Sequence, residues 1–133
     1  MDPATSSPSA YPPHRLGARG EQIAADRLER SGWHILARGY RLGRREVDLV
    51  VRRRATLAFV EVKTRSGCRY GPPENAVTRH KRNEIEAVAR DYLMRHPVGV
   101  TDVRFDVVAI EIGSGGEIVR YEHIEDAWRP DAP

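Results

Sequence analysis

Two β-rich stretches decide the fold of this chain: REVDLVVR at residues 45–52 and LAFVEVK at residues 57–63. Their β-branched content favours strands, and the short connection RRAT at residues 53–56 is typical of a hairpin turn. If the turn is centred between Arg54 and Ala55, Asp48 lies opposite Glu61. The same register places Glu46 opposite Lys63 and Val50 opposite Phe59.

The side chains of this hairpin should divide between two faces, because successive strand residues point to opposite sides of a sheet. One face is entirely apolar and is expected to rest on the core; it holds Val47, Leu49, Val51, Ala58, Val60 and Val62. The other face gathers charged side chains, namely Glu46, Asp48, Glu61 and Lys63.

Asp48 and Glu61 form the central candidate site. Directly paired strand residues stand about 4.5 to 5.5 Å apart, so two carboxylates there repel each other unless a cation lies between them. Mg²⁺ binds carboxylate oxygens and retains several waters, which leaves positions for a phosphate and an attacking water. Lys63 emerges on the same face, where its ammonium would orient that water or stabilise charge on a phosphoryl group.

Two interpretations of this charged face stay open. It is either a metal site or a solvated surface on which Lys63 pairs across the strands with Glu46. Lysine usage favours the metal site, because only Lys63 and Lys81 are lysines among 22 lysine and arginine residues. A chain that otherwise uses arginine is expected to keep lysine where a compact ammonium is needed.

The length of 133 residues fits one domain with a single core. We expect a disordered N-terminal arm over residues 1–14, a folded domain over 15–122 and a C-terminal tail over 123–133. The sequence contains no signal-peptide apolar region and no run of about 18 apolar residues. Its single cysteine, Cys68, excludes an internal disulfide. We therefore expect a cytoplasmic protein without membrane association.

Arginine is concentrated around the candidate site, although the net charge is only +3. Residues 38–54 contain Arg38, Arg41, Arg44, Arg45, Arg52, Arg53 and Arg54. Such a cluster suits a polyanionic backbone. The alternative is that an arginine-rich composition places arginine on every surface.

The rest of the chain predicts an α/β domain. Apolar residues recur at helical spacing from Gly17 to Arg30, where Glu21 either complements the helix dipole or adds an acid to the site. A second helix should follow the N-cap Thr78, with a core stripe of Ile85, Val88, Ala89, Tyr92 and Leu93. Further strands are expected at residues 33–38, 103–112 and 117–122. This order predicts a mixed β-sheet flanked by helices, with one parallel strand pair made by a crossover.

Several motifs together carry a resemblance to a known family. They are GARGEQIA at 17–24, EVDLV at 46–50, FVEVKTR at 59–65, AVTRHKR at 76–82 and RFDVV at 104–108. Over residues 15–112 the chain resembles the uncharacterised bacterial YraN-like family, which is similar in fold to restriction endonucleases and archaeal Holliday-junction resolvases. The chain departs from that pattern at Arg45, where the family usually has Gly, and at Gly39, where it has Asn.

The resemblance implies a single restriction endonuclease-like domain with Asp48 and Glu61 as metal ligands, Lys63 as the catalytic lysine and Glu21 as an additional acidic group. We therefore expect a Mg²⁺- or Mn²⁺-dependent nuclease acting on structured or branched DNA. The alternatives are a non-catalytic nucleic-acid-binding module of the same fold in DNA repair or processing, and a purely structural interaction protein.

We expect nucleic acid to contact Arg41, Arg44, Arg45, Arg65, Lys81 and Arg82. Lys81 and Arg82 fall in the first turn of the second helix, where a phosphate would offset their unfavourable interaction with the helix dipole. Symmetric cleavage of a four-way junction would favour a homodimer, although no segment of the sequence identifies a dimer interface.

Overall fold

The structure is a computed structural model that describes residues 13–66, 77–97, 99–100 and 102–130. The elements in these ranges are α1 (Pro13–Arg30), β1 (His34–Leu42), β2 (Arg45–Arg53), β3 (Thr56–Ser66), α2 (Arg79–Arg95), β4 (Asp102–Ile112) and β5 (Ile118–Trp128). The strands form one sheet in the order β1-β2-β3-β4-β5, with β3 and β4 parallel and the other pairs antiparallel. The predicted α/β class and the parallel crossover pair are confirmed, and the arrangement is consistent with a restriction endonuclease-like fold.

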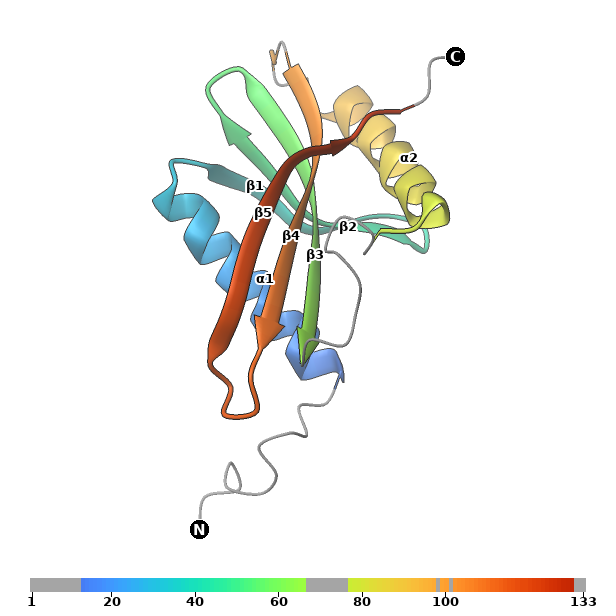
Figure 1. The fold of residues 1–133 in the computed structure, drawn as a ribbon. Coiled ribbons are helices and arrows are strands. Elements are labelled where there is room, and N and C mark those ends of the chain that lie inside the picture. The colour runs from blue at the N-terminus through green and yellow to red at the C-terminus, as the bar shows by residue number, and fades with distance from the viewer. Residues whose placement is uncertain (1–12, 67–76, 98, 101, 131–133) are drawn as a thin grey trace.

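The two helices cover opposite faces of the sheet (Figure 1). On one face α1 packs Ala24, Ala25 and Leu28 against the apolar side chains of the central strands. On the other face α2 packs the predicted stripe, with Ile85, Val88, Ala89 and Tyr92 buried. Burial on both faces explains why β2 and β3 read as nearly continuous apolar runs.

The hairpin register deduced from the sequence is confirmed. Val50 pairs with Phe59, and the ladder runs from Arg53↔Thr56 to Leu49↔Val60. Arg54 has a left-handed backbone with φ 56°, as expected for the first central residue of a tight hairpin turn. The described pairing stops at Leu49, one residue before Asp48, so the site lies where β2 departs from β3.

The expected division of the hairpin into an apolar and a charged face is wrong in two respects. Val50 and Phe59 lie on the face expected to be charged, yet both are fully buried beneath α2. Val47 belongs to this same α2-side cluster, whereas the other five apolar residues expected beside it lie on the α1 side. Val50 and Phe59 obey the alternation and are apolar because α2 covers their face. Val47 departs from the alternation where β2 has left β3 beyond Leu49.

Several elements are longer than expected. Helix α1 begins at Pro13, within the expected N-terminal arm, because proline is well tolerated in the first turn of a helix. Strand β1 continues to Leu42 and turns at Gly43, whose φ is +63°. Strand β5 runs through Trp128 instead of ending near residue 122, because Trp128 is buried and stacks on Phe105. Residues 1–12 of the expected arm and Cys68 lie outside the described residues.

Neither α1 nor α2, the helices of the described part of the chain, combines the length and apolar character that crossing a lipid bilayer requires.

Helix α1 is held close to β3 at a single glycine. A Cβ atom on Gly20 would overlap the Thr64 hydroxyl, so only glycine lets the two elements approach at this point. Glu21 is the next residue, and the close approach therefore brings its side chain toward the candidate site.

We expect Gly20→Ala to destabilise the fold by about 1–3 kcal/mol, because the added methyl group must push α1 away from Thr64. Gly17→Ala is the matched control, since the same change in the same helix meets nothing within 4 Å. The control should be neutral or stabilising by up to about 1 kcal/mol. Urea unfolding of both variants measures the difference, and equal stabilities would contradict the close-packing interpretation.

Candidate metal and catalytic site

Asp48 is fixed at the point where β2 leaves β3. Its Oδ2 accepts a hydrogen bond of 2.7 Å from the backbone N–H of Val62. A side chain thus continues the connection between the strands where the regular ladder has ended. Burial raises the pKa of Asp48, and the Val62 N–H opposes that rise. The carboxylate is therefore positioned by the backbone and only partly compensated for its burial.

Glu61 is the most deeply buried carboxylate of the site, with 4% of its surface exposed. Its Oε1 is buried and has no hydrogen-bond partner among the described residues. Burial, and next the negative charge of Asp48, raise the pKa of Glu61 to about 8. An uncompensated buried carboxyl oxygen is costly, so a structure keeps one only where something else offsets it or uses it.

Both lysines of the chain converge on Glu61. Lys63 and Lys81 each place Nζ 3.9 Å from Glu61 Oε2, from β3 and α2 respectively. Lys81 also lies 3.8 Å from Glu84 Oε2 and donates a hydrogen bond of 3.3 Å to the Glu46 carbonyl oxygen. The unusual lysine usage is thus explained by position, because both ammonium groups contact one buried acid.

Glu21 approaches the site from α1. Burial, and then the charges of Asp48 and Glu46, raise its pKa to about 7, while Arg38 acts in the opposite direction. The dependence on Asp48 and Glu46 means that these acids share one electrostatic environment. Glu21 had two interpretations, a complement to the helix dipole or an additional acid of the site. The second agrees with this arrangement.

The expected pairing of Glu46 with Lys63 is not found. Glu46 instead lies opposite Arg41 on β1, with Arg41 Nε 3.3 Å from its Oε2. The reason is again that β2 leaves β3 before Glu46 and stays paired with β1. The alternative of a solvated charged face is also wrong for Glu61, which is buried.

The basic residues expected to contact nucleic acid differ in their exposure and in their contacts. Arg41, Arg44 and Arg45 are exposed at the β1–β2 turn, beside the strand end that carries Asp48. Arg65 is half-buried on β3, and Arg82 bonds the Val77 carbonyl oxygen and lies over Trp128. Lys81 points into the acidic cluster and not toward solvent at the start of α2.

The chemistry of Asp48 and Glu61 fits a hard divalent cation. Two close carboxylates with raised pKa values, one with an orphaned buried oxygen, are stabilised when positive charge lies between them. No cluster of three or more His, Cys, Asp or Glu side chains forms a metal cage within the described ranges. Mg²⁺ is commonly bound by one or two carboxylates, with water molecules completing its coordination shell.

Sequence reasoning missed one contributor to the site. Lys81 is predicted both as a nucleic-acid contact and as a site candidate from the flanking helix, and in the structure it lies beside Glu61. Glu84 received no role, and only its spacing of three residues from Lys81 on one helix indicates the ion pair.

The raised pKa of Glu61 predicts a pH-dependent stability. Between the usual value of 4.5 and about 8, the folded protein holds a proton that the unfolded chain has lost, so stability falls as pH rises through this window. We expect Glu61→Gln to remove at least about 1 kcal/mol of that decline between about pH 5 and pH 8, measured by urea unfolding with a chelator present. Glu29→Gln, an exposed change on α1, should keep the wild-type slope.

Comparison with known proteins agrees with these motifs. The model of the uncharacterised protein family UPF0102 matches residues 20–110. A UPF0102 protein of Chlorobium phaeobacteroides is 42% identical over 123 residues, covering 90% of this chain and 97% of the relative. Those of Rhodococcus opacus and Geobacter sulfurreducens are 44% and 45% identical over 113 residues, covering 85% of this chain and 95% and 88% of the relatives. The chain therefore belongs to the UPF0102 family.

Proposed function

We propose that this protein is a Mg²⁺-dependent nuclease that hydrolyses phosphodiester bonds in structured or branched DNA. The observation that carries the proposal is the buried pair Asp48 and Glu61, with an orphaned carboxyl oxygen and two lysine ammonium groups at Glu61. Paired carboxylates beside a lysine suit chemistry in which negative charge develops on a phosphoryl group. The other members of this site support the same reading.

Each residue has a specific role in this proposal. Asp48 and Glu61 would hold the divalent cation, which when bound supplies Lewis-acid stabilisation and a more acidic water. Lys63 is 38% exposed at its side chain, so its ammonium can reach both Glu61 and an incoming phosphate. It would donate hydrogen bonds to the phosphoryl oxygens and orient the attacking water. Water loses a proton to solvent as it adds to phosphorus, the bond to the leaving oxygen breaks, and that oxygen takes up a proton from solvent.

Lys81 would act on Glu61 and would not contact the substrate. It is less exposed than Lys63, and its contacts to Glu61, Glu84 and the Glu46 carbonyl hold it against the acids. Its charge lowers the pKa of Glu61, which favours the carboxylate form that a cation needs. Lys81 is therefore a positioning residue in this proposal, whereas Lys63 faces the substrate.

A second candidate function is a non-catalytic nucleic-acid-binding module of the same fold. It is favoured by the contact between Lys81 and Glu61, which partly neutralises the acids with no cation present. In that case the arginines of the β1–β2 turn would bind the backbone while the acidic site remained without turnover. The two functions differ in whether a product forms.

We expect the wild-type protein to cleave at least one of linear, flapped and four-way DNA in Mg²⁺ or Mn²⁺. Asp48→Asn, Glu61→Gln and Lys63→Gln should each slow cleavage by about 100-fold or more, because each removes a group from the reacting centre. Glu29→Gln is the matched carboxylate control and should cleave like the wild type. Gel analysis of labelled strands measures the rates.

Absence of any cleavage by the wild type, or equal cleavage by Asp48→Asn, would exclude the nuclease. DNA binding that is unaffected by Glu61→Gln and yields no product would instead support the binding module. A Mn²⁺-dependent rise in melting temperature that Asp48→Asn abolishes would show separately that the acids hold a cation.

The exposed arginines at the β1–β2 turn predict a measurable salt dependence. Arg44→Gln combined with Arg45→Gln should weaken DNA binding and make the plot of log affinity against log salt shallower by about 1–2 units, since each lost phosphate contact contributes about 0.9. The control removes two exposed arginines elsewhere, Arg90 and Arg129. If the control has the same effect, binding follows net charge and not this turn. Fluorescence anisotropy over a salt series distinguishes the outcomes.

A further inference from the structure

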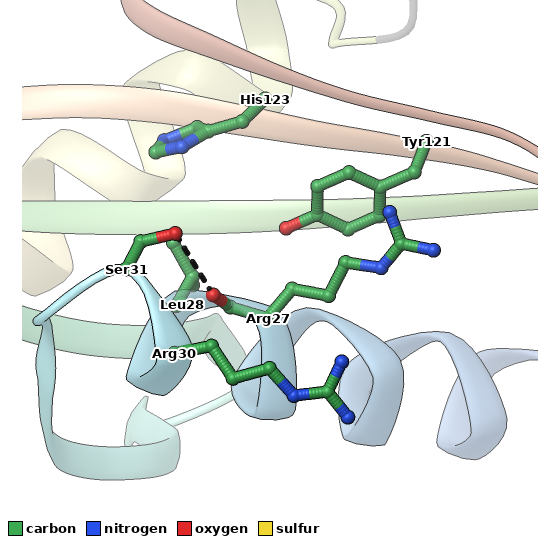
Figure 2. A pocket seen from close by; sticks show the side chains of 6 residues that line it. All are labelled: Arg27, Leu28, Arg30, Ser31, Tyr121 and His123. Atoms are coloured by element: carbon green, nitrogen blue, oxygen red, sulfur yellow. Dashed lines mark hydrogen bonds between the residues drawn. The ribbon is translucent and has the colours of Figure 1, made fainter.

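A pocket lies between the last turn of α1 and strand β5 (Figure 2). It has a volume of about 360 Å³ and contains none of the residues of the acidic site. Figure 2 shows the His123 ring and the Tyr121 hydroxyl facing the last turn of α1. The lining residues are Arg27, Leu28, Arg30, Ser31, Tyr121 and His123.

Several polar side chains line the pocket. Two guanidinium groups, one imidazole and two hydroxyls line it, and no carboxylate does. Within the described ranges neither Arg27 nor Arg30 forms a salt bridge, so their positive charges are not neutralised there.

Several of these groups are already held in place. The Arg27 guanidinium carbon lies 4.5 Å from the centre of the Tyr121 ring, and the Ser31 hydroxyl bonds the Arg27 carbonyl oxygen at 3.1 Å. The His123 ring packs edge-on against Trp33. A ligand binding here would therefore have little side-chain ordering to impose, which favours its affinity.

His123 is fixed from behind by a buried carboxylate. Its Nε2 lies 2.8 Å from Asp106 Oδ2, and Asp106 is fully buried. Arg104 and the backbone N–H of Asp126 also donate to Asp106, so this carboxylate is satisfied and stays charged. With Nε2 engaged by Asp106, Nδ1 is the ring nitrogen left to face the pocket.

The helix dipole alone does not account for this arrangement. Basic residues in the last turn are favoured by the negative end of a helix, which would explain Arg27 and Arg30 by themselves. It does not explain why a carboxylate-oriented histidine and a tyrosine hydroxyl from β5 face the same space. Convergence of donors from two elements is typical of an oxyanion site.

We propose that this pocket binds a phosphate group. Arg27 and Arg30 supply positive charge for an oxyanion, and the Tyr121 hydroxyl supplies a further donor. The phosphate comes either from a free phosphate or nucleotide or from a nucleic-acid backbone. The site is independent of the proposed nuclease centre: Arg30 lies about 13 Å along α1 from Glu21, at a rise of about 1.5 Å per residue.

The test is an NMR titration of the full-length protein with inorganic phosphate at constant ionic strength, with chloride as the matched salt. The His123 ring signals, identified by their loss in His123→Gln, should shift saturably with phosphate and not with chloride. Arg27→Gln and Arg30→Gln should each weaken binding about tenfold or more, because each removes a charge-assisted donor. Arg90→Gln, an exposed change on α2, should leave it unchanged.

The second arm adds a short single-stranded oligonucleotide to the phosphate-bound protein. Displacement of phosphate would identify the ligand as a nucleic-acid backbone, and lack of displacement as a free phosphate or nucleotide. Arg30→Gln keeps the test valid if loss of Arg27 from the Tyr121 ring disturbs folding. The proposal is overturned if phosphate does not shift His123, or if Arg90→Gln weakens binding as much as the pocket variants. Asp48→Asn should retain phosphate binding, so failure of the nuclease proposal would be seen separately.

Discussion

The structure depends on keeping two carboxyl groups, Asp48 and Glu61, together at the end of the β2–β3 ladder. Burial disfavours the charged form of both groups and raises both pKa values, and the charge of Asp48 raises the pKa of Glu61 further. The Val62 N–H that bonds Asp48, and the Lys63 and Lys81 ammonium groups beside Glu61, offset only part of this cost. The apolar layers on both faces of the sheet must supply the rest. Such a local conflict is expected where a site is preorganised for a ligand.

Local sequence determines much of this arrangement. The β-branched runs and the turn at Arg54 and Ala55 are sufficient to fix the hairpin register, because one slipped residue would turn every side chain to the opposite face. The Thr78 cap and the apolar stripe likewise predict α2, and its N-cap hydroxyl accepts from the Lys81 N–H as expected. Asp48 and Glu61 could be found this way because both lie within one hairpin.

The parts that could not be predicted depend on contacts between distant segments. Val47 lies beneath α2 and Glu46 lies beside Arg41 where β2 has left β3 and is paired with β1 alone, and nothing in residues 45–52 specifies where β2 leaves β3. Lys81 reaches Glu61 only because the crossover helix returns across the sheet. The extension of β5 to Trp128 depends on stacking with Phe105 and on the bond from the Asp126 N–H to Asp106. Local propensity does not encode these tertiary contacts.

A comparison within the molecule separates structural from functional burial of acids. Asp106 is as buried as Glu61, and burial acts to raise its pKa, yet donors from His123, Arg104 and the Asp126 backbone hold that pKa below its usual value. The fold can therefore satisfy a buried carboxylate fully, on the β-strand adjacent to Glu61. At Glu61 it leaves Oε1 without a partner in the described structure and places Asp48 alongside. Because the same sheet satisfies a buried carboxylate at Asp106 and not at Glu61, the unsatisfied pair supports the proposal of a cation site over a role in packing alone.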